Sequence, residues 1–168
     1  DFVREGSAAI YAENRVSWSD WFRTQLGVRG DLYAVNVHSN LSQNSGSAQD
    51  GLISPKFGMV FGPWAKTELF FNVGRGFHSN DARGVTIAVD PKDTSQSVNK
   101  VPLLVRAQGA EIGWRTYILD GLQTSLTLFG LDYRSEILFV GDAGTTEPSR
   151  ASRRTGLELA NHYVYAPW

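Results

Sequence analysis

Residues 21–32, WFRTQLGVRGDL, decide how the fold is interpreted. Apolar and polar side chains alternate here at every second position, with Phe22, Leu26, Val28 and Leu32 on one side and Arg23, Gln25, Arg29 and Asp31 on the other. Successive residues of a β-strand point to opposite faces of the sheet. The stretch therefore predicts a strand with one apolar face and one charged face.

The same alternation recurs along the chain, so the sequence predicts about seven strands. The other segments are residues 7–15, 54–62, 68–75, 110–115, 122–128 and 154–162. The predicted fold class is all-β, an antiparallel up-and-down meander. The ionic and amide residues expected on the polar face are Arg23, Arg29, Asp31, Glu68, Asn72, Glu111, Arg115, Arg154 and Glu158.

Period-two alternation is compatible with a soluble antiparallel sheet that has one wet face. The lengths of the connections favour a transmembrane β-barrel instead. Short connections are expected at 17–20, 63–66 and 119–121, and long ones at 39–50, 77–104 and 141–151. Short and long connections therefore alternate, as the periplasmic turns and outer loops of outer-membrane barrels do.

Tryptophan placement supports the same interpretation. Trp18, Trp21, Trp64 and Trp168 lie at or beside the short-turn ends of the expected strands, whereas Trp114 does not. Indole rings favour the membrane–water boundary, so these residues suggest an aromatic girdle, with a buried core cluster as the alternative. The apolar face would then contact lipid and the charged face would line a lumen, because an arginine at the lipid midplane costs about 2–4 kcal/mol.

Three groups of segments are distinctive: SPKFG at 54–58 followed by TELFFNVGRGFHSNDARG at 67–84, GAEIGWR at 109–115 followed by EILFVGDAGT at 136–145, and SRRTGLEL at 152–159. In this order and spacing they resemble the barrel of TonB-dependent outer-membrane receptors. The resemblance implies a larger transmembrane β-barrel of about 22 strands, closed by an N-terminal plug. The sequence has neither the plug nor the C-terminal closing strand of this family, so we expect residues 1–168 to be an internal part of the barrel.

The resemblance also implies a location and partners. Such receptors sit in the bacterial outer membrane and take up scarce ligands such as ferric siderophores, haem or cobalamin. The implied partners are the rest of the barrel and its plug, outer-membrane lipid and lipopolysaccharide, and the TonB-ExbB-ExbD complex, which acts through the N-terminal part. Under this interpretation the outer-loop candidates for ligand contact are Arg75, His78, Asn80, Asp81 and Arg83.

Two features leave alternatives open. Gly74, Gly76, Gly113 and Gly156 fall inside expected strands, where they either leave room for a plug or mark bulges. Arg75, Arg153 and Arg154 are expected near the outer rim, where they would pair with a plug carboxylate, hold lipopolysaccharide phosphate or form surface ion pairs.

Composition excludes several classes. The chain has no cysteine, so disulfides, thiolate metal sites and a cysteine nucleophile are excluded. With 16 basic and 17 acidic residues it lacks the basic balance of a nucleic-acid-binding protein. No catalytic constellation, cofactor motif or spaced set of metal ligands is present, so we expect neither an enzyme nor a resident cofactor or metal. The alternative to a receptor is a soluble all-β module that binds a ligand or glycan.

Overall fold

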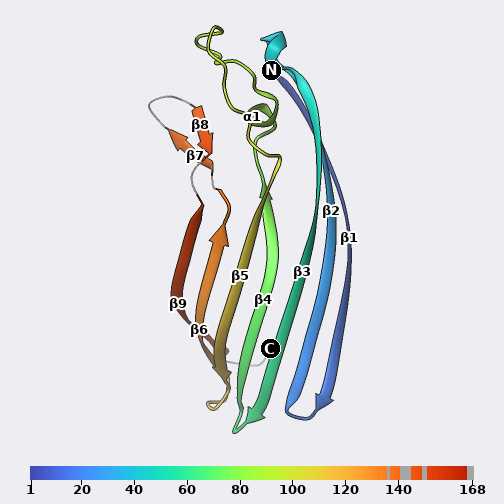
Figure 1. Ribbon diagram of the computed structural model, residues 1–168. Helices are drawn as coiled ribbons and strands as arrows, with labels where there is room; N and C mark the ends of the chain where they lie inside the picture. The colour runs from blue at the N-terminus through green and yellow to red at the C-terminus, as the bar shows by residue number, and fades with distance from the viewer. Residues whose placement is uncertain (136, 141–144, 149–150, 166–168) are drawn as a thin grey trace.

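The computed structural model describes residues 1–135, 137–140, 145–148 and 151–165. Its main element is one seven-stranded antiparallel sheet in the order β1-β2-β3-β4-β5-β6-β9 (Figure 1). The strands are β1 (Phe2–Ser19), β2 (Phe22–His38), β3 (Gly46–Trp64), β4 (Thr67–Ser79), β5 (Leu104–Thr116), β6 (Leu122–Tyr133) and β9 (Ser152–Tyr163). Strands consecutive in the sheet are also consecutive among the long strands of the chain, which confirms the predicted up-and-down meander.

Smaller elements lie in the connections. A 3₁₀ turn, η1 (Ser42–Asn44), joins β2 to β3, and a short helix, α1 (Ala82–Thr86), lies between β4 and β5. The strands β7 (Ile137–Val140) and β8 (Thr145–Pro148) form a separate two-stranded sheet. This hairpin was not predicted. No helix among the described residues has the length and apolar character needed to cross a membrane.

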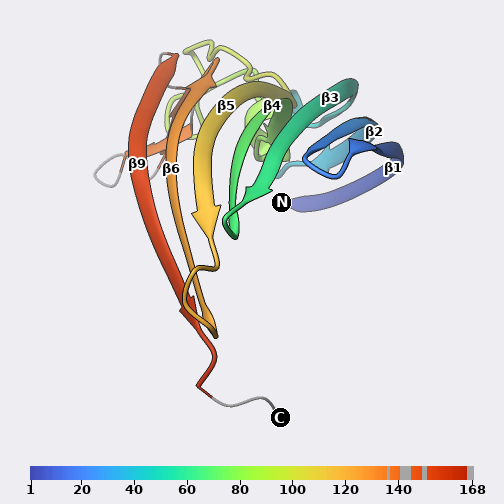
Figure 2. The same ribbon diagram turned by 90° about the horizontal axis from the view of Figure 1, so that it is seen from below.

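The seven-stranded sheet bends into an arc with a concave and a convex face, as the view along the strands shows (Figure 2). Its connections are sorted by length. Residues 20–21, 65–66 and 117–121 turn tightly at one end, whereas residues 39–45 and 80–103 form long connections at the other. The predicted alternation is confirmed for these connections, and the one expected at 141–151 lies partly outside the described residues.

Several strands extend further than the alternation predicted. The first strand was expected at 7–15 and the third at 54–62, but β1 and β3 are both much longer. In β3 the ladder with β2 continues from Phe61 to Gly46, through Gln49 and Ser47, whose polar side chains weaken the sequence pattern. Backbone hydrogen bonds to a neighbouring strand hold these residues extended whatever their side chains.

The long connection 80–103 packs against the sheet and forms a small hydrophobic core. Val35, Val37 and Leu52 of β2 and β3 are buried in it. From the connection and the start of β5 it receives Ala82, Val85, Val101, Leu103 and Leu104. Leu52 stands opposite Asp31 in the ladder, and Val35 and Val37 share its face by register, so these three residues lie on the same face as the predicted lumen residues.

Asn44 anchors this connection to the neighbouring one. Its side-chain oxygen accepts hydrogen bonds from the backbone N–H groups of Ala88 (2.8 Å) and Val89 (2.9 Å), and its amide donates to the Val89 carbonyl (3.0 Å). Thr86 donates its hydroxyl to the Asn44 carbonyl at 2.9 Å. Asn44 is buried, and its side chain satisfies partly buried backbone groups of the connection.

We predict that Asn44→Ala loosens the connection 80–103 while the strands remain paired. The loss leaves the partly buried N–H groups of Ala88 and Val89 without their acceptor, at up to about 1–3 kcal/mol each. Trypsin cleavage of the complete folded protein after Arg83, Lys92 and Lys100 should therefore accelerate at least about fivefold, since local opening governs cleavage. Gln43→Ala, an exposed amide in the same turn, is the control, and equal cleavage in the two variants would contradict the anchor.

Candidate functional site

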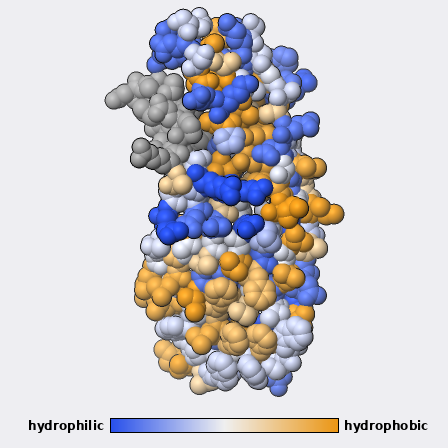
Figure 3. Space-filling view, viewed as in Figure 1, coloured by the Kyte–Doolittle hydropathy of each residue, from blue (hydrophilic) through white to orange (hydrophobic). Residues whose placement is uncertain are grey.

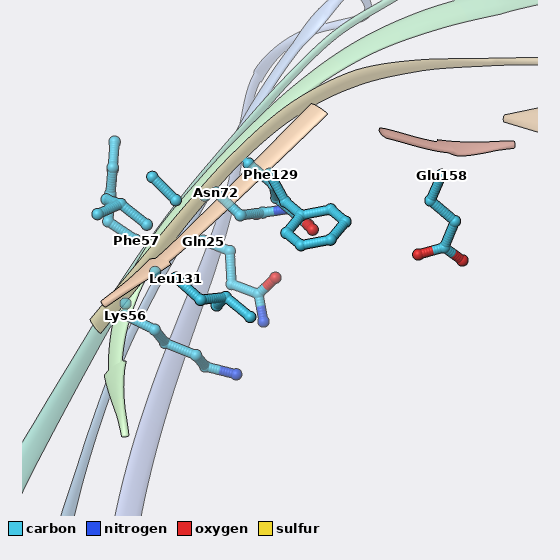
Figure 4. A pocket seen from close by; sticks show the side chains of 13 residues that line it. Gln25, Lys56, Phe57, Asn72, Phe129, Leu131 and Glu158 are labelled. Atoms are coloured by element: carbon cyan, nitrogen blue, oxygen red, sulfur yellow. The ribbon is translucent and has the colours of Figure 1, made fainter. Parts of the chain in front are cut away.

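The ladder places all the predicted polar-face residues on one face of the sheet. Residues directly opposite each other in a ladder share a face, and Glu68 faces Arg115 while Asn72 faces Glu111. Figure 4 shows the side chains of Gln25, Lys56 and Asn72 on one side of the ribbon and Phe57 on the other. The polar residues occupy the concave side.

An ion network ties three strands together near the short turns. Glu68 of β4 accepts a hydrogen bond from Arg23 Nη2 at 2.5 Å and one from Arg115 Nε at 2.7 Å. The Glu68 side chain is only 10% exposed, whereas the two arginines are 37% and 36% exposed. One shielded carboxylate therefore balances two arginines, and the network carries net positive charge on the concave face.

The other predicted polar-face residues form local contacts. Asn72 donates its amide to Glu111 Oε1 at 2.8 Å, and Arg29 Nε pairs with Asp31 at 2.9 Å. The Arg154 guanidinium lies 5.1 Å from the centre of the Tyr133 ring, within range of a cation–π contact. These pairs lie at different heights along the strands, so the structure does not bring all the predicted residues into one cluster.

A hollow of about 530 Å³ lies on the concave face, where charged and aromatic side chains meet (Figure 4). Its lining includes the predicted Asn72, Glu111 and Glu158 and also Gln25, Lys56, Phe129 and Leu131. The last four were absent from the predicted site. The Lys56 ammonium also pairs with Glu13 of β1 at 2.5 Å. Gln25 and Lys56 already fell on the polar side of the sequence alternation, but only the register shows that they meet.

The outer-loop prediction is wrong for two of its residues. Arg75 is the last residue of the strand expected at 68–75, and both it and His78 lie within β4, because pairing with β5 continues to Ser79 and Leu104. Arg75 also falls on the opposite face from Glu68 and Asn72, so its side chain belongs to the convex face. The run from Gly74 to His78 has no clear alternation of apolar and polar residues, which is why the sequence did not reveal this.

The remaining three outer-loop candidates hold the connection together. Asn80 is buried and donates its amide to the Pro102 carbonyl at 2.6 Å. Asp81 caps α1 by accepting a hydrogen bond from the Arg83 backbone N–H at 2.9 Å, and its carboxylate pairs with the Arg83 guanidinium at 2.6 Å. The Arg83 guanidinium holds the pKa of the Asp81 carboxyl below its usual value. These contacts make Asn80 and Asp81 structural residues of the connection.

The described members of the predicted aromatic girdle do gather at one end. Trp18, Trp21 and Trp64 lie at the short-turn end of the sheet, and all three are at least half exposed. The rings of Trp21 and Trp64 stack with centroids 6.3 Å apart, and Trp18 Nε1 donates to the Thr24 hydroxyl at 2.8 Å. Trp168 lies outside the described residues. Within the described ranges, no three histidine or acidic side chains converge as they would around a metal ion.

The chain belongs to the family described as TonB dependent receptor-like, beta-barrel, whose sequence profile matches residues 1–168. Three solved structures share its fold. The copper transporter OprC has 16% identity and a TM-score of 0.72, covering 98% of this chain and 27% of its own. The ferric-catecholate import receptor Fiu from K12 E. coli has 17% identity and a TM-score of 0.72, covering 98% and 26%. The ferric yersiniabactin uptake receptor FyuA from Yersinia pestis has 16% identity and a TM-score of 0.69, covering 98% and 25%.

The chain therefore spans about a quarter of the length of the structures it matches. No curated protein sequence matches it significantly. At these identities the structural matches establish the fold alone. The family is one of receptors and transporters, not of enzymes.

We predict that the stability of α1 falls at low pH and is independent of pH near neutrality. Because the pKa of Asp81 is lowered in the folded protein, its carboxylate stabilises the helix above the usual Asp pKa of about 3.9 and stops doing so as the pH falls through the lowered value. Amide protection of residues 81–87, corrected for intrinsic exchange, should be constant between about pH 7 and pH 5 and fall below about pH 4.

Asp81→Asn keeps the cap oxygen but loses the charge, so it should remove this dependence. Asp93→Asn is the matched control. Hydrogen bonds from Ser95 also lower the pKa of Asp93, but this residue lies nearer the tip of the connection. A decline in protection that begins near pH 6, or one that survives Asp81→Asn, would refute the assignment to Asp81.

Proposed function

We propose that the chain is an internal part of the barrel wall of a bacterial outer-membrane receptor that takes up a scarce ligand with energy from TonB. The observation that carries this proposal is that the ion-paired residues near the short turns and the exposed large apolar side chains lie on opposite faces of the sheet. The concave face holds the ion pairs described above. The convex face exposes large apolar side chains in their place.

The convex face supports contact with hydrocarbon. Leu69, Ile112, Leu128 and Leu157 lie on the convex face of four successive strands, and each is close to or more than half exposed. A contiguous apolar surface of this kind is rare on a soluble monomer. It therefore disfavours the alternative of a soluble all-β module that binds a ligand or glycan.

The concave face supports a lumen that receives a plug and ligand. Charged residues at the lipid midplane would be costly, and the ion-paired Arg23, Glu68 and Arg115 lie on the concave side instead. The proposed partners are the rest of the barrel and its plug on this side, and outer-membrane lipid and lipopolysaccharide on the other. The TonB-ExbB-ExbD complex would act through the N-terminal part of the receptor.

The ligand is proposed only as a class. The solved structures that share the fold carry names referring to copper, ferric-catecholate and ferric yersiniabactin. We extend to this chain the general task of taking up a scarce metal complex or cofactor, such as a ferric siderophore, haem or cobalamin. The connection 80–103, folded over the concave face, is the part of the chain best placed to contact such a ligand.

We predict opposite tolerance to charge at two adjacent residues of β6. Leu128 is 54% exposed on the convex face, and Leu128→Arg should reduce the yield of folded barrel in the outer membrane because it costs about 2–4 kcal/mol near the midplane. Thr127→Arg, on the concave face, should leave the yield unchanged. Heat-dependent gel mobility of the outer-membrane fraction measures folded barrel, and equal losses in both variants would refute the membrane-facing assignment.

We predict that uptake through the complete protein requires TonB. A strain lacking the gene should lose uptake of at least one radiolabelled probe from a panel of ferric siderophores, haem, cobalamin and copper. A plasmid-borne copy of the gene should restore uptake in the deletion strain when TonB is present. It should fail to restore uptake in a deletion strain that also lacks TonB. Unchanged uptake of every probe in the deletion strain, or restoration without TonB, would refute the proposed function.

A further inference from the structure

A row of polar residues crosses the convex face near the long-connection end. In the ladder Arg75 of β4 faces Gln108 of β5, Gln108 faces Asp132 of β6, and Asp132 faces Arg153 of β9. The row therefore lies on one face, and that face is the convex one, which also carries Leu69 and Leu128. Figure 3 shows hydrophilic residues across the upper parts of these strands, above a hydrophobic region.

A second polar row bounds the same apolar region at its other end. Thr67, Thr116, Thr124 and Asn161 face one another in the same ladders. From Thr67 to Arg75 the strand runs about 26 Å at roughly 3.3 Å per residue. A strand tilt of about 40° reduces this to roughly 20 Å along the membrane normal, close to the apolar band of outer-membrane barrels at about 25 Å. The arginine row therefore lies at the height of lipid headgroups.

Two hollows on the convex face meet at the arginine row. A groove of about 790 Å³ lies next to the row, on its short-turn side, and runs across the strands from Leu26 and Phe57 to Thr155. Small residues, Ala110 and Gly130, lie along its floor. The groove is therefore largely apolar away from the row, and its volume suits a segment of hydrocarbon chain.

The second hollow is basic. It measures about 560 Å³ and is lined by four arginines, Arg75, Arg106, Arg134 and Arg153, together with Asp132. Both hollows share Arg75, Gln108, Asp132 and Arg153 in their linings, so they are continuous.

The arginines of the basic hollow are only partly neutralised. Arg153 pairs with Asp132 at 2.6 Å, and Gln108 donates to the same carboxylate at 3.4 Å. Arg75, Arg106 and Arg134 are exposed, and their guanidinium groups have no hydrogen-bond or ion-pair partner among the described residues. Three guanidinium groups without a described partner, beside a largely apolar groove, match an amphiphile with an anionic head.

We propose that these two hollows bind a phosphate-bearing lipid of the surrounding leaflet. An acyl chain occupies the groove over Ala110 and Gly130, and the headgroup phosphate contacts Arg75, Arg106 and Arg134. Arginine suits this role because its planar fork donates two parallel hydrogen bonds to phosphate oxygens. The inference rests on the membrane position given under the proposed function, but it assigns a site that ligand uptake does not require.

The test measures lipid binding to the complete protein, purified and delipidated in a neutral detergent, by native mass spectrometry. The probes are lipid A, the same lipid without its phosphates, and inorganic phosphate. The unmodified protein should retain lipid A and lose most of that affinity for the dephosphorylated form. The triple variant Arg75→Gln, Arg106→Gln, Arg134→Gln should bind lipid A about a hundredfold more weakly, at roughly fivefold per arginine near an anionic lipid.

A second variant tests the groove without touching a charge. Gly130→Leu fills the floor, where an added Cβ would meet Thr155 at an ordinary contact distance of 3.9 Å, and it should weaken lipid A binding with the arginines intact. Arg15→Gln, an exposed arginine on the concave face of β1, is the control and should bind lipid A normally.

Three outcomes would overturn the lipid site. The first is equal binding of lipid A to the triple variant and the unmodified protein, and the second is equal binding of the two lipid forms to the unmodified protein. The third is displacement of lipid A by inorganic phosphate at matched concentration, since this displacement would indicate a site for free anions. These outcomes can be told apart from failure of the proposed function. The lipid test measures lipid binding to protein that has already folded in the membrane, whereas the Leu128 and uptake tests measure the yield of folded barrel and ligand uptake.

Discussion

The register of the ladders is the constraint on which the rest of the structure depends. Because side chains alternate with a period of two, shifting one strand by a single residue would send its arginines to the apolar face and its leucines to the ionic one. Contacts across the concave face fix the register chosen. Glu68 joins β2, β4 and β5 through Arg23 and Arg115, and Lys56 joins β3 to β1 through Glu13. The ion pairs therefore favour the register that gives the sheet one ionic and one apolar face.

The same register divides the concave face along its length. Near the short turns this face carries ion pairs, but toward the long connections Val35, Val37 and Leu52 take the places that charged residues occupy below. Exposure of these apolar side chains to water would cost free energy. The connection 80–103 covers them with its own apolar residues, and Asn44 satisfies the backbone groups that this packing removes from solvent. The folded connection is thus a consequence of apolar strand ends on an otherwise ionic face.

Much of this was predictable from the sequence, since alternation is a local property. The face of each predicted polar residue, the meander and the sorting of connections by length all follow from residues close together in the chain. What depends on register was not predictable. Lys56 meets Glu13 across 43 positions, and Asn44 meets Val89 across 45. The outer-loop prediction for Arg75 was wrong for a local reason. The glycines on either side of Arg75 interrupt the alternation of apolar and polar residues that would have shown which face its side chain takes.

The two boundaries of the convex apolar region differ in chemistry, and this difference gives the sheet a direction. At the short-turn end the bounding row is neutral, with Thr67 and Thr116 sharing a hydrogen bond at 2.9 Å and Thr124 donating to Asn161 at 2.7 Å. Exposed indole rings lie at that end, and they suit an interface of any charge because they are neutral. At the long-connection end, arginines take this place. A guanidinium group is a permanent cation, so anionic headgroups stabilise it at a boundary more than neutral ones do. A bilayer with an anionic leaflet on one side would therefore favour the orientation of the sheet that places the arginine row in that leaflet.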